Sequence, residues 1–159
     1  MDKLTIKSGK KGPHIKRGIV DAIIKEMGLE KDIYKFKQIR NRISSFKNSL
    51  ITVKAYNNDT DLQEADAISR RPKIGEIYKE YVERCFKAGA MDFDDLLLKT
   101  NELLNIHPQV LAKYQDRFRY ILVDEYQDTN HSQYLIVRAL SDKFQNICVV
   151  GDDAQSIYG

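Results

Sequence analysis

Apolar residues recur at helical spacing along the first two thirds of the chain. Such runs extend over residues 19–27, 36–50 and 77–86, and this spacing places the apolar side chains on one face of an α-helix. Gly28 and Gly89 follow two of these runs, where glycine commonly ends a helix because it adopts a positive φ without strain. The pattern therefore predicts three amphipathic helices, two of them ended by glycine.

Helix start signals mark further segments. The polar residues NNDTD open a weaker helical pattern over residues 57–70, which should end before Pro72 because the residue before a proline avoids the helical region. Asp92 stands at the capping position of the next helix, with Asp95 three residues further along. Pro108 suits the first turn of another helix, where its missing N–H has no helical partner. The chain is thus expected to be helical for over two thirds of its length.

The hydrophobic period changes near residue 120. Residues 120–123 and 147–150 are short β-branched runs, and a helical pattern over about residues 132–143 separates them. A strand, a helix and a second strand at this spacing are typical of a parallel βαβ unit. The predicted fold class is therefore mostly α-helical with a small α/β part.

Composition narrows the possible roles. The 159 residues are 42% hydrophobic, which is typical of a globular domain, and no apolar run is long enough to cross a bilayer. The N-terminus lacks the apolar stretch of a signal peptide, so we expect a cytoplasmic protein without membrane association. Cys85 and Cys148 have no neighbouring cysteine or histidine at metal-ligand spacing, so each is expected to be a buried, reduced thiol.

The net charge of +3 conceals a strong asymmetry. Residues 1–54 contain 14 Lys and Arg against 5 Asp and Glu, a net of +9, whereas the remaining residues contain 12 against 18, a net of −6. Within this basic segment (residues 1–54), residues 7–18 combine three glycines with a proline and predict a loop or mobile segment. The basic segment is a candidate for contact with nucleic-acid phosphates. The alternative is a helix surface that merely carries solvated lysines and arginines.

Acidic residues follow both predicted strands. Asp124 and Glu125 come directly after the first strand in YILVDEYQDTN, and Asp152 and Asp153 follow Gly151 after the second. In open α/β sheets, ligands bind beyond the carboxyl ends of the strands, and oxygen ligands there suit a hydrated Mg²⁺. The alternative is that these acids cap the following helix or face water. The strand-plus-acid pattern alone leaves both interpretations open.

The longer motifs resemble those of a known family. VDEYQDTN followed by VVGDDAQSIYG resembles motifs II and III of the UvrD/Rep/PcrA family of superfamily 1 DNA helicases. The resemblance is close over residues 89–159 and diffuse over residues 1–88, where the family has a helical insertion called subdomain 1B. It implies a helical, 1B-like subdomain over residues 1–90 and part of a RecA-like P-loop NTPase core over residues 91–159.

The resemblance implies roles for individual residues. Asp124 would bind Mg²⁺ together with Glu125, and Glu125 would also activate the attacking water as a general base. Gln155 would contact the γ-phosphate of ATP and couple hydrolysis to movement on DNA, and Tyr158 would stack on single-stranded DNA. ATP and Mg²⁺ would be the cofactors. Two further motif residues would have a positioning role or, alternatively, cap the following helix: Gln127 and Asp128.

The phosphate-binding loop of such an ATPase, G-x-x-x-x-G-K-S/T, does not occur in the sequence. We therefore expect the chain to be an excised middle part of a larger helicase and to hydrolyse ATP negligibly by itself. In the family's sheet the motif III strand lies between the motif II strand and the phosphate-loop strand. Because this sequence lacks the phosphate-loop strand, residues 147–150 are expected to form an exposed apolar edge.

For the basic segment (residues 1–54), the resemblance implies contact with duplex or junction DNA. Binding through phosphates would be independent of sequence and strongly dependent on salt. The whole enzyme would couple ATP hydrolysis to 3′-to-5′ movement and duplex unwinding in DNA repair or replication. Two alternatives remain: a non-catalytic module that binds DNA or a partner through its basic helices, and the helicase part of a RecB- or AddA-type helicase-nuclease. The candidate DNA contacts are Tyr158, Lys10, Lys11, Lys16, Arg17, Arg40 and Arg42.

Overall fold

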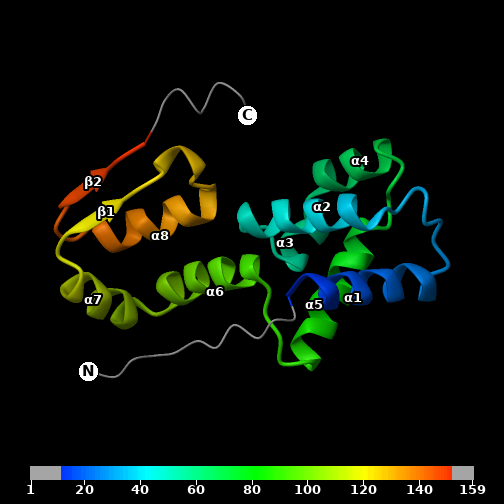
Figure 1. Ribbon diagram of the computed structural model, residues 1–159, viewed down its shortest axis with the longest axis horizontal. Helices are drawn as coiled ribbons and strands as arrows, with labels where there is room; N and C mark the ends of the chain where they lie inside the picture. Colours follow the sequence, from blue (N-terminus) through cyan, green and yellow to red (C-terminus); the bar gives the residue numbers. More distant parts are fainter. Residues whose placement is uncertain (1–11, 152–159) are drawn as a thin grey trace. The chain divides into compact units, whose positions relative to one another are not determined.

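The computed structural model describes residues 12–151, with side chains described from Arg17 onward. Within this range the chain is mostly helical and contains one small sheet (Figure 1). It divides into two compact units, of which the first comprises the residues up to Ile43 together with Thr52–Asp92. The second comprises Ser44–Ile51 together with the residues from Phe93 onward. None of the described helices is long and apolar enough to span a membrane.

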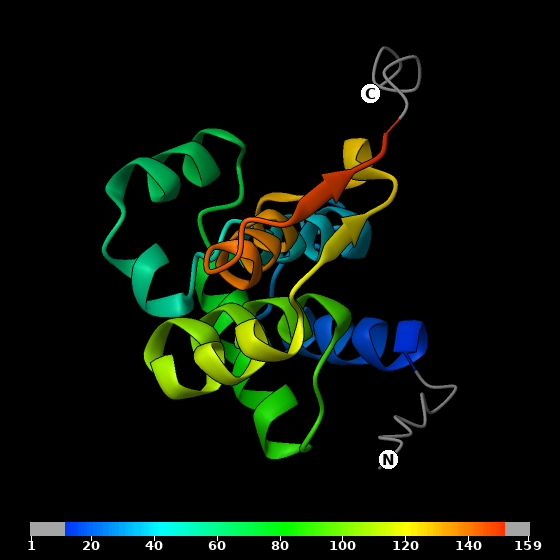
Figure 2. The same cartoon turned by 90° about the vertical axis from the view of Figure 1, so that its left-hand side faces the viewer.

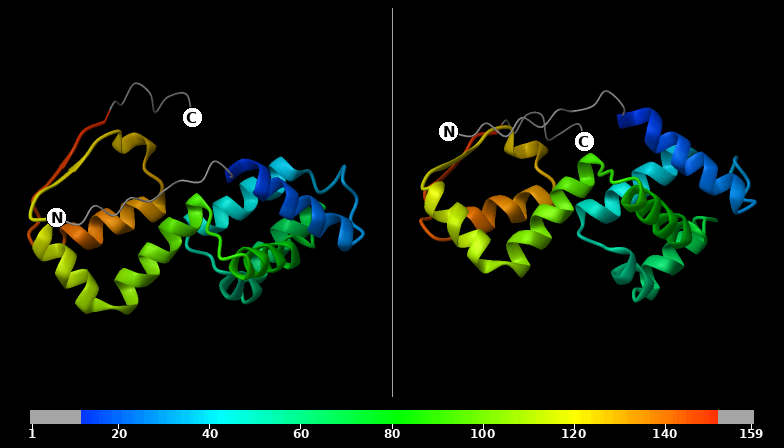
Figure 3. Two further views of the ribbon diagram at one scale, coloured as in Figure 1. Left: turned by 60° about the horizontal axis from the view of Figure 1, so that its bottom comes forward. Right: turned by 90° about the horizontal axis from the view of Figure 1, so that it is seen from below.

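The first unit is built from helices (Figure 3), which enclose one apolar core. Its elements are α1 (Gly12–Glu26), the first part of α2 (Phe36–Asn48), α3 (Val53–Asn57), α4 (Thr60–Ile68) and α5 (Ile74–Lys87). Helix α1 packs against α5, and α3 packs against both α4 and α5. The buried apolar residues of this unit are Val20, Ile23, Ile24, Tyr34, Ile39, Ile43, Tyr56, Ile74, Ile77, Tyr78, Tyr81 and Cys85. The three predicted amphipathic helices are therefore confirmed.

Helix α1 begins earlier than the sequence pattern predicts. The predicted loop over residues 7–18 is wrong from Gly12 onward, where the helix has already begun, and residues 7–11 lie outside the described part. Pro13 stands in the first turn, where proline loses no helical hydrogen bond. Gly18 costs the helix about 1 kcal/mol relative to alanine. Burial of the apolar face of α1 against α5 outweighs this cost, because each buried isoleucine or valine contributes about 1.5–3 kcal/mol.

Glycine ends two helices, as predicted. Gly28 follows α1 with a φ of 65°, and the amide of Leu29 donates to the carbonyl of Ile24 at 3.0 Å. Gly89 follows α5 with a φ of 58°, and the amide of Ala90 makes the equivalent bond at 2.9 Å. In both cases the left-handed residue lets the chain turn back and satisfy the last carbonyls of the helix.

Two helix starts also follow the predicted signals. Helix α4 begins after Asp59, whose carboxylate accepts from the amide of Leu62 at 3.0 Å. Pro108 is the first residue of α7 (Pro108–Arg117). The sequence pattern misses the short helix α3, which is capped by Thr52, because its five residues are too few to show a helical period.

The second unit combines three helices with a two-stranded sheet. Besides α7, its elements are α6 (Phe93–Ile106), β1 (Ile121–Val123), the single 3-10 turn η1 (Tyr126–Asp128), α8 (His131–Ser141) and β2 (Ile147–Val149). Helices α6, α7 and α8 pack against one another. Strands β1 and β2 run parallel (Figure 2). Leu122 lies opposite Cys148. The predicted strand–helix–strand unit is therefore confirmed.

The last turn of α2 belongs to this second unit. Phe46 and Lys47 are each 1% exposed, and the Lys47 ammonium lies 2.7 Å from the Asp95 carboxylate of α6. A lysine that loses its hydration is tolerated in a protein interior only when it is paired. The ion pair therefore fixes the end of α2 to the start of α6.

The sheet has an exposed apolar edge. All three residues of β2 are exposed, with Ile147 at 43% and Val149 at 49%. This finding confirms the edge predicted for residues 147–150. The expectation of a buried thiol is correct for Cys85 in α5 and wrong for Cys148, because Cys148 lies on the exposed strand.

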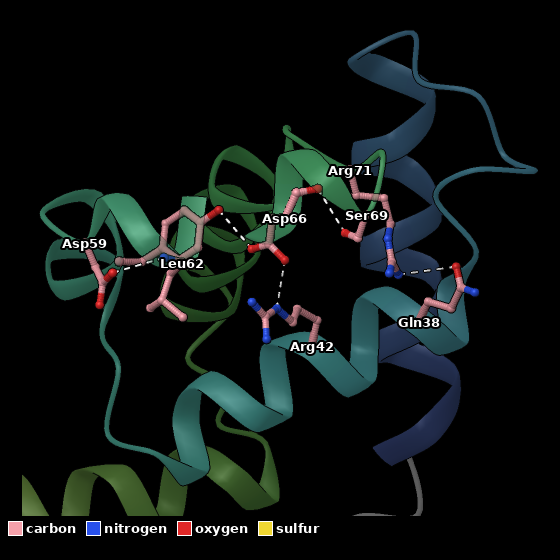
Figure 4. A network of polar contacts seen from close by, with 8 residues as sticks. Gln38, Arg42, Asp59, Leu62, Asp66, Ser69 and Arg71 are labelled. Carbon is pink, nitrogen blue, oxygen red and sulfur yellow. Dashed lines mark hydrogen bonds and ion pairs between the residues drawn. The ribbon is translucent and has the colours of Figure 1, made fainter. Parts of the chain in front are cut away.

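A buried carboxylate connects three helices of the first unit (Figure 4). Asp66 of α4 is 3% exposed, and its two oxygens accept from Nε of Arg42 at 2.9 Å and from the hydroxyl of Tyr56 at 3.0 Å. The bonds tie α4 to α2 and α3. Burial, followed by the bond to Asp66, raises the pKa of Tyr56 to about 12. The phenol therefore remains a hydrogen-bond donor throughout the neutral range.

We predict that Tyr56 makes the first unit less stable in strong alkali. Because its folded-state pKa of about 12 exceeds the unfolded value, Tyr56 stabilises the fold below pH 10 and loses this contribution between pH 10 and 12. The loss should reach about 2 kcal/mol. Tyr56→Phe should be about 1 kcal/mol less stable than the wild type at pH 8, and this deficit should shrink as the pH rises. Urea unfolding across the alkaline range measures the difference; a pH-independent deficit would contradict the prediction.

A second contact of Tyr56 excludes a side chain at Gly75. A Cβ at Gly75 would lie 2.3 Å from Cε1 of the Tyr56 ring, whereas a Cβ at Gly18 in α1 would meet no atom within 4 Å. We predict that Gly75→Ala destabilises the protein by about 1–3 kcal/mol through overpacking. The matched change Gly18→Ala should stabilise it by about 0.5–1 kcal/mol. Thermal unfolding measures both changes, and shifts of the same sign would argue against the steric explanation.

Candidate functional site

The predicted acidic residues lie in a loop that leaves the carboxyl end of β1, here called the acidic loop (residues 124–130). Backbone hydrogen bonds join it to the end of β2. The amide of Val150 donates to the carbonyl of Val123 at 2.8 Å, and the amide of Tyr126 donates to the carbonyl of Val150 at 3.0 Å. The two acidic residues occupy the positions between these bonds. The parallel pairing thus brings the loop to the edge of the sheet where ligands of α/β proteins bind.

Glu125 has an unusual backbone conformation. Its φ of 52° and ψ of 42° lie in the left-handed region, which costs a non-glycine residue about 1–2 kcal/mol. Its amide donates to Oδ1 of Asp124 at 2.9 Å, and its carbonyl accepts from the amide of Asp128 at 3.0 Å. Strained residues of this kind are concentrated at functional sites. The side chains of Asp124 and Glu125 are both exposed.

Gln127 lies between Glu125 and the end of β2. Its Nε2 donates to Oε2 of Glu125 at 2.6 Å. On its other side, a Cβ at Gly151 would lie only 2.7 Å from Oε1 of Gln127. A glycine at position 151 therefore leaves the space that the glutamine side chain occupies, and the glutamine in turn holds the carboxylate of Glu125.

The helix that follows the acidic loop has its own cap. Oδ1 of Asn130 accepts from the amide of Gln133 at 2.9 Å, and the side chain of Gln133 accepts from the amide of Asn130 at 3.1 Å. This reciprocal capping box satisfies amides at the start of α8. The alternative in which Gln127 and Asp128 cap the helix is therefore wrong, because Asn130 fills the capping position.

The acidic loop offers carboxylate ligands suited to a hard cation. Among the described residues, no three His, Cys, Asp or Glu side chains gather into a metal-binding group. Mg²⁺ usually keeps several waters and takes one or two carboxylates together with substrate phosphates, so Asp124 and Glu125 suffice for it. The chemistry of the loop fits a phosphate-bound Mg²⁺, whereas a structural zinc site would need four protein ligands.

Two of the candidate DNA contacts are exposed on the first unit. Arg17 of α1 pairs with Asp21 at 3.6 Å, and its guanidinium carbon lies 5.8 Å from the centre of the Phe36 ring. Arg40 of α2 donates to its neighbour Asn41 at 3.2 Å. Both arginines remain accessible to solvent, so either could meet a phosphate group.

Arg42 has a structural role, and its contact with DNA stays a prediction. Its side chain is 30% exposed and pairs with Asp66, which stands 24 positions further along the chain. The charge pattern of the sequence gives no sign of this partner. The side chain of Lys16 lies outside the described part of the chain. The remaining candidate residues lie wholly outside it: Lys10, Lys11, Asp152, Asp153, Gln155 and Tyr158.

The comparison with known proteins identifies the family. The family described as UvrD/REP helicase N-terminal domain matches residues 2–159. Because the match covers nearly the whole chain, the protein belongs to this family. This result confirms the resemblance to UvrD/Rep/PcrA helicases that the two motifs indicate.

Individual relatives give the same assignment. The chain is 39% identical to ATP-dependent DNA helicase PcrA of Bacillus subtilis (strain 168) over 140 residues, which are 88% of the chain and 18% of the relative. It is 36% identical to the protein of that name from Staphylococcus aureus (strain Mu50) over 147 residues, 92% of the chain and 19% of the relative. It is 46% identical to DNA helicase II of Rickettsia typhi (strain Wilmington) over 136 residues, 82% of the chain and 20% of the relative. The chain thus spans about a fifth of the length of these curated relatives.

Proposed function

We propose that the chain forms part of an ATP-dependent DNA helicase of the UvrD/Rep/PcrA type. Its relatives carry the names ATP-dependent DNA helicase PcrA and DNA helicase II. The observation that carries the proposal is the acidic loop, a family motif that stands at the carboxyl end of β1 in a parallel strand–helix–strand unit. The basic segment, residues 1–54, supplies a surface that attracts DNA phosphates.

In this proposal, Asp124 and Glu125 hold a Mg²⁺ ion that is bound to the phosphates of ATP. The ion neutralises negative charge that develops on the phosphates during hydrolysis. Glu125 also accepts a proton from the attacking water, as a general base does. The bond from Gln127 Nε2 to Oε2 of Glu125 keeps that carboxylate in one orientation. ATP and Mg²⁺ are therefore the proposed cofactors.

The proposal extends to the motif III residues and to the whole enzyme. Gln155 contacts the γ-phosphate of ATP and links hydrolysis to movement, and Tyr158 stacks on a base of single-stranded DNA. Residues 1–90 act as the helical insertion, and residues 91–159 contribute to the RecA-like core. The whole enzyme moves 3′ to 5′ and unwinds duplex DNA during repair or replication in the cytoplasm.

A non-catalytic DNA-binding module is the second candidate function. It is favoured by the exposure of Arg17 and Arg40 and by the lack of a phosphate-binding loop in the 159 residues. In that case the basic helices bind DNA, and the acidic loop takes no part in nucleotide chemistry. The two candidates therefore share DNA binding and differ in whether the acidic loop meets a nucleotide.

We predict that the purified chain binds DNA in a salt-dependent manner. Labelled duplex, single-stranded and junction DNA should each show a rise in fluorescence anisotropy at low salt. The affinity should fall steeply between about 50 and 200 mM salt, because each neutralised phosphate releases counterions. Arg40→Glu should weaken binding several-fold and reduce the salt slope by about one.

Lys113→Glu in α7 is the matched control, since it makes the same change of charge at an exposed lysine of the second unit. This variant should bind DNA like the wild type. Arg42 is unsuitable for the test, because its replacement would leave the buried Asp66 without its cation. No binding at low salt, or an equal loss in both variants, would refute DNA contact by α2.

We also predict that the 159-residue chain hydrolyses ATP negligibly, because its sequence contains no phosphate-binding loop. A phosphate-release assay with Mg²⁺ and excess single-stranded DNA should show no turnover above the buffer rate. The contrary result would be Mg²⁺-dependent turnover that Glu125→Gln abolishes. It would mean that the chain builds a complete catalytic site from other residues.

A further inference from the structure

The acidic loop is anchored at its far end by a residue outside its own motif. Nδ2 of Asn130 donates to Oδ1 of Asn48 at 3.2 Å. The two asparagines stand 82 positions apart in the sequence, and both belong to the second unit. Their bond joins the end of the acidic loop to the last residue of α2.

This bond is additional to the cap of α8. The cap uses Oδ1 of Asn130, which accepts from the amide of Gln133, and the backbone amide of Asn130, which donates to the Gln133 side chain. Neither of these bonds requires Nδ2. The contact with Asn48 therefore fixes where the end of the loop lies and contributes nothing directly to capping.

Asn48 makes two further, longer contacts of its own. Its Nδ2 lies 3.4 Å from Oδ1 of Asp94 and 3.4 Å from Oγ of Ser44. The contact with Asp94 sets the orientation of the amide, because the opposite orientation would place the amide oxygen against a carboxylate. The preceding residue, Lys47, is buried and pairs with Asp95. Two successive residues of α2 are thus bonded to the first turn of α6.

The contact to Glu125 comes from a short segment, residues 126–130, that is hydrogen-bonded to other parts of the unit at both ends. Tyr126 is bonded to Val150 at one end of the turn η1, and Asn130 is bonded to Asn48 just after the other end. Gln127 lies between these anchors, and its side chain holds the Glu125 carboxylate. A shift of Asn130 would therefore move η1 and alter the contact between Gln127 and Glu125.

We propose that Asn48 is a positioning residue for the Glu125 carboxylate, acting through Asn130 and the turn that carries Gln127. The geometric part of this proposal concerns hydrogen bonds within the second unit. Its catalytic meaning rests on the proposed function, in which Glu125 is the general base. Asn48 lies in the basic segment (residues 1–54), far from motifs II and III in the sequence, so neither motif assigns it a role.

The test is residue-resolved hydrogen exchange by NMR on the 159-residue chain. Asn48→Ala should accelerate exchange of the Gln127 side-chain amide and of the Thr129 backbone amide by about fivefold, the effect of losing one hydrogen bond. Asn130→Asp should accelerate the same two amides, because an aspartate caps as well as an asparagine but has no Nδ2 donor. The Gln133 amide, which the cap protects, should be unchanged in Asn130→Asp.

Ser45→Ala is the matched control, since Ser45 is an exposed residue of the same helix. It should leave the acidic loop unchanged, and amides inside α6 should keep their protection in every variant. Unchanged exchange at Gln127 in a folded Asn48→Ala protein would overturn the proposal. Equally accelerated amide exchange throughout α6 would overturn it as well, because Asn48 would then stabilise the whole second unit rather than position the acidic loop. If Asn48→Ala fails to fold, Asn130→Asp gives the answer alone.

The experiment separates this inference from the proposed function. It uses no nucleotide and no DNA, so its outcome depends only on hydrogen bonds within the second unit. An unaltered loop in the variants refutes positioning by Asn48, while the assignment to a helicase is unaffected. Conversely, a chain that binds no DNA at low salt would refute the proposed DNA contact by α2, while the exchange pattern would still establish the Asn48 contact.

Discussion

The parallel pairing of β1 and β2 is the constraint on which the candidate site depends. Each strand has only three residues, and the backbone of Val150 both donates to Val123 and accepts from Tyr126. These two bonds enclose Asp124 and Glu125, so the carboxylates are held at the edge of the sheet rather than in a free loop. Without β2, the residues on either side of Asp124 and the left-handed Glu125 would lose these two bonds.

Buried ion pairs complete the framework, and they change how the charge of the sequence should be interpreted. Arg42 is committed to Asp66 in the first unit, and Lys47 is committed to Asp95 in the second. Removing one partner of such a pair typically costs about 3–5 kcal/mol, because the other charge stays buried alone. Of the cations behind the net charge of +9 in residues 1–54, Lys47 is therefore internal and Arg42 is partly buried, so the charge offered to DNA is smaller than the composition suggests.

Local patterns in the sequence predicted most elements because each is encoded within a few residues. The helical spacing of apolar residues, the glycines after α1 and α5, and the acids after β1 all act at short range. The errors have longer-range causes. Burial of the apolar face of α1 against α5 outweighs the cost of Gly18 within the helix, and the open edge of the sheet exposes Cys148. The bond between Asn48 and Asn130 joins residues that no local pattern relates, so only the folded chain reveals it.

The most direct test of the account is whether the acidic loop receives a divalent cation. Mn²⁺ broadens the NMR signals of nuclei near its binding site and can replace Mg²⁺ at oxygen ligands. When Mn²⁺ is added to the labelled chain, the backbone signals of residues 124–128 should broaden first, and Asp124→Asn should remove this effect. Broadening centred on other acidic residues, such as Asp59 and Asp61, and unaltered by Asp124→Asn would contradict the account.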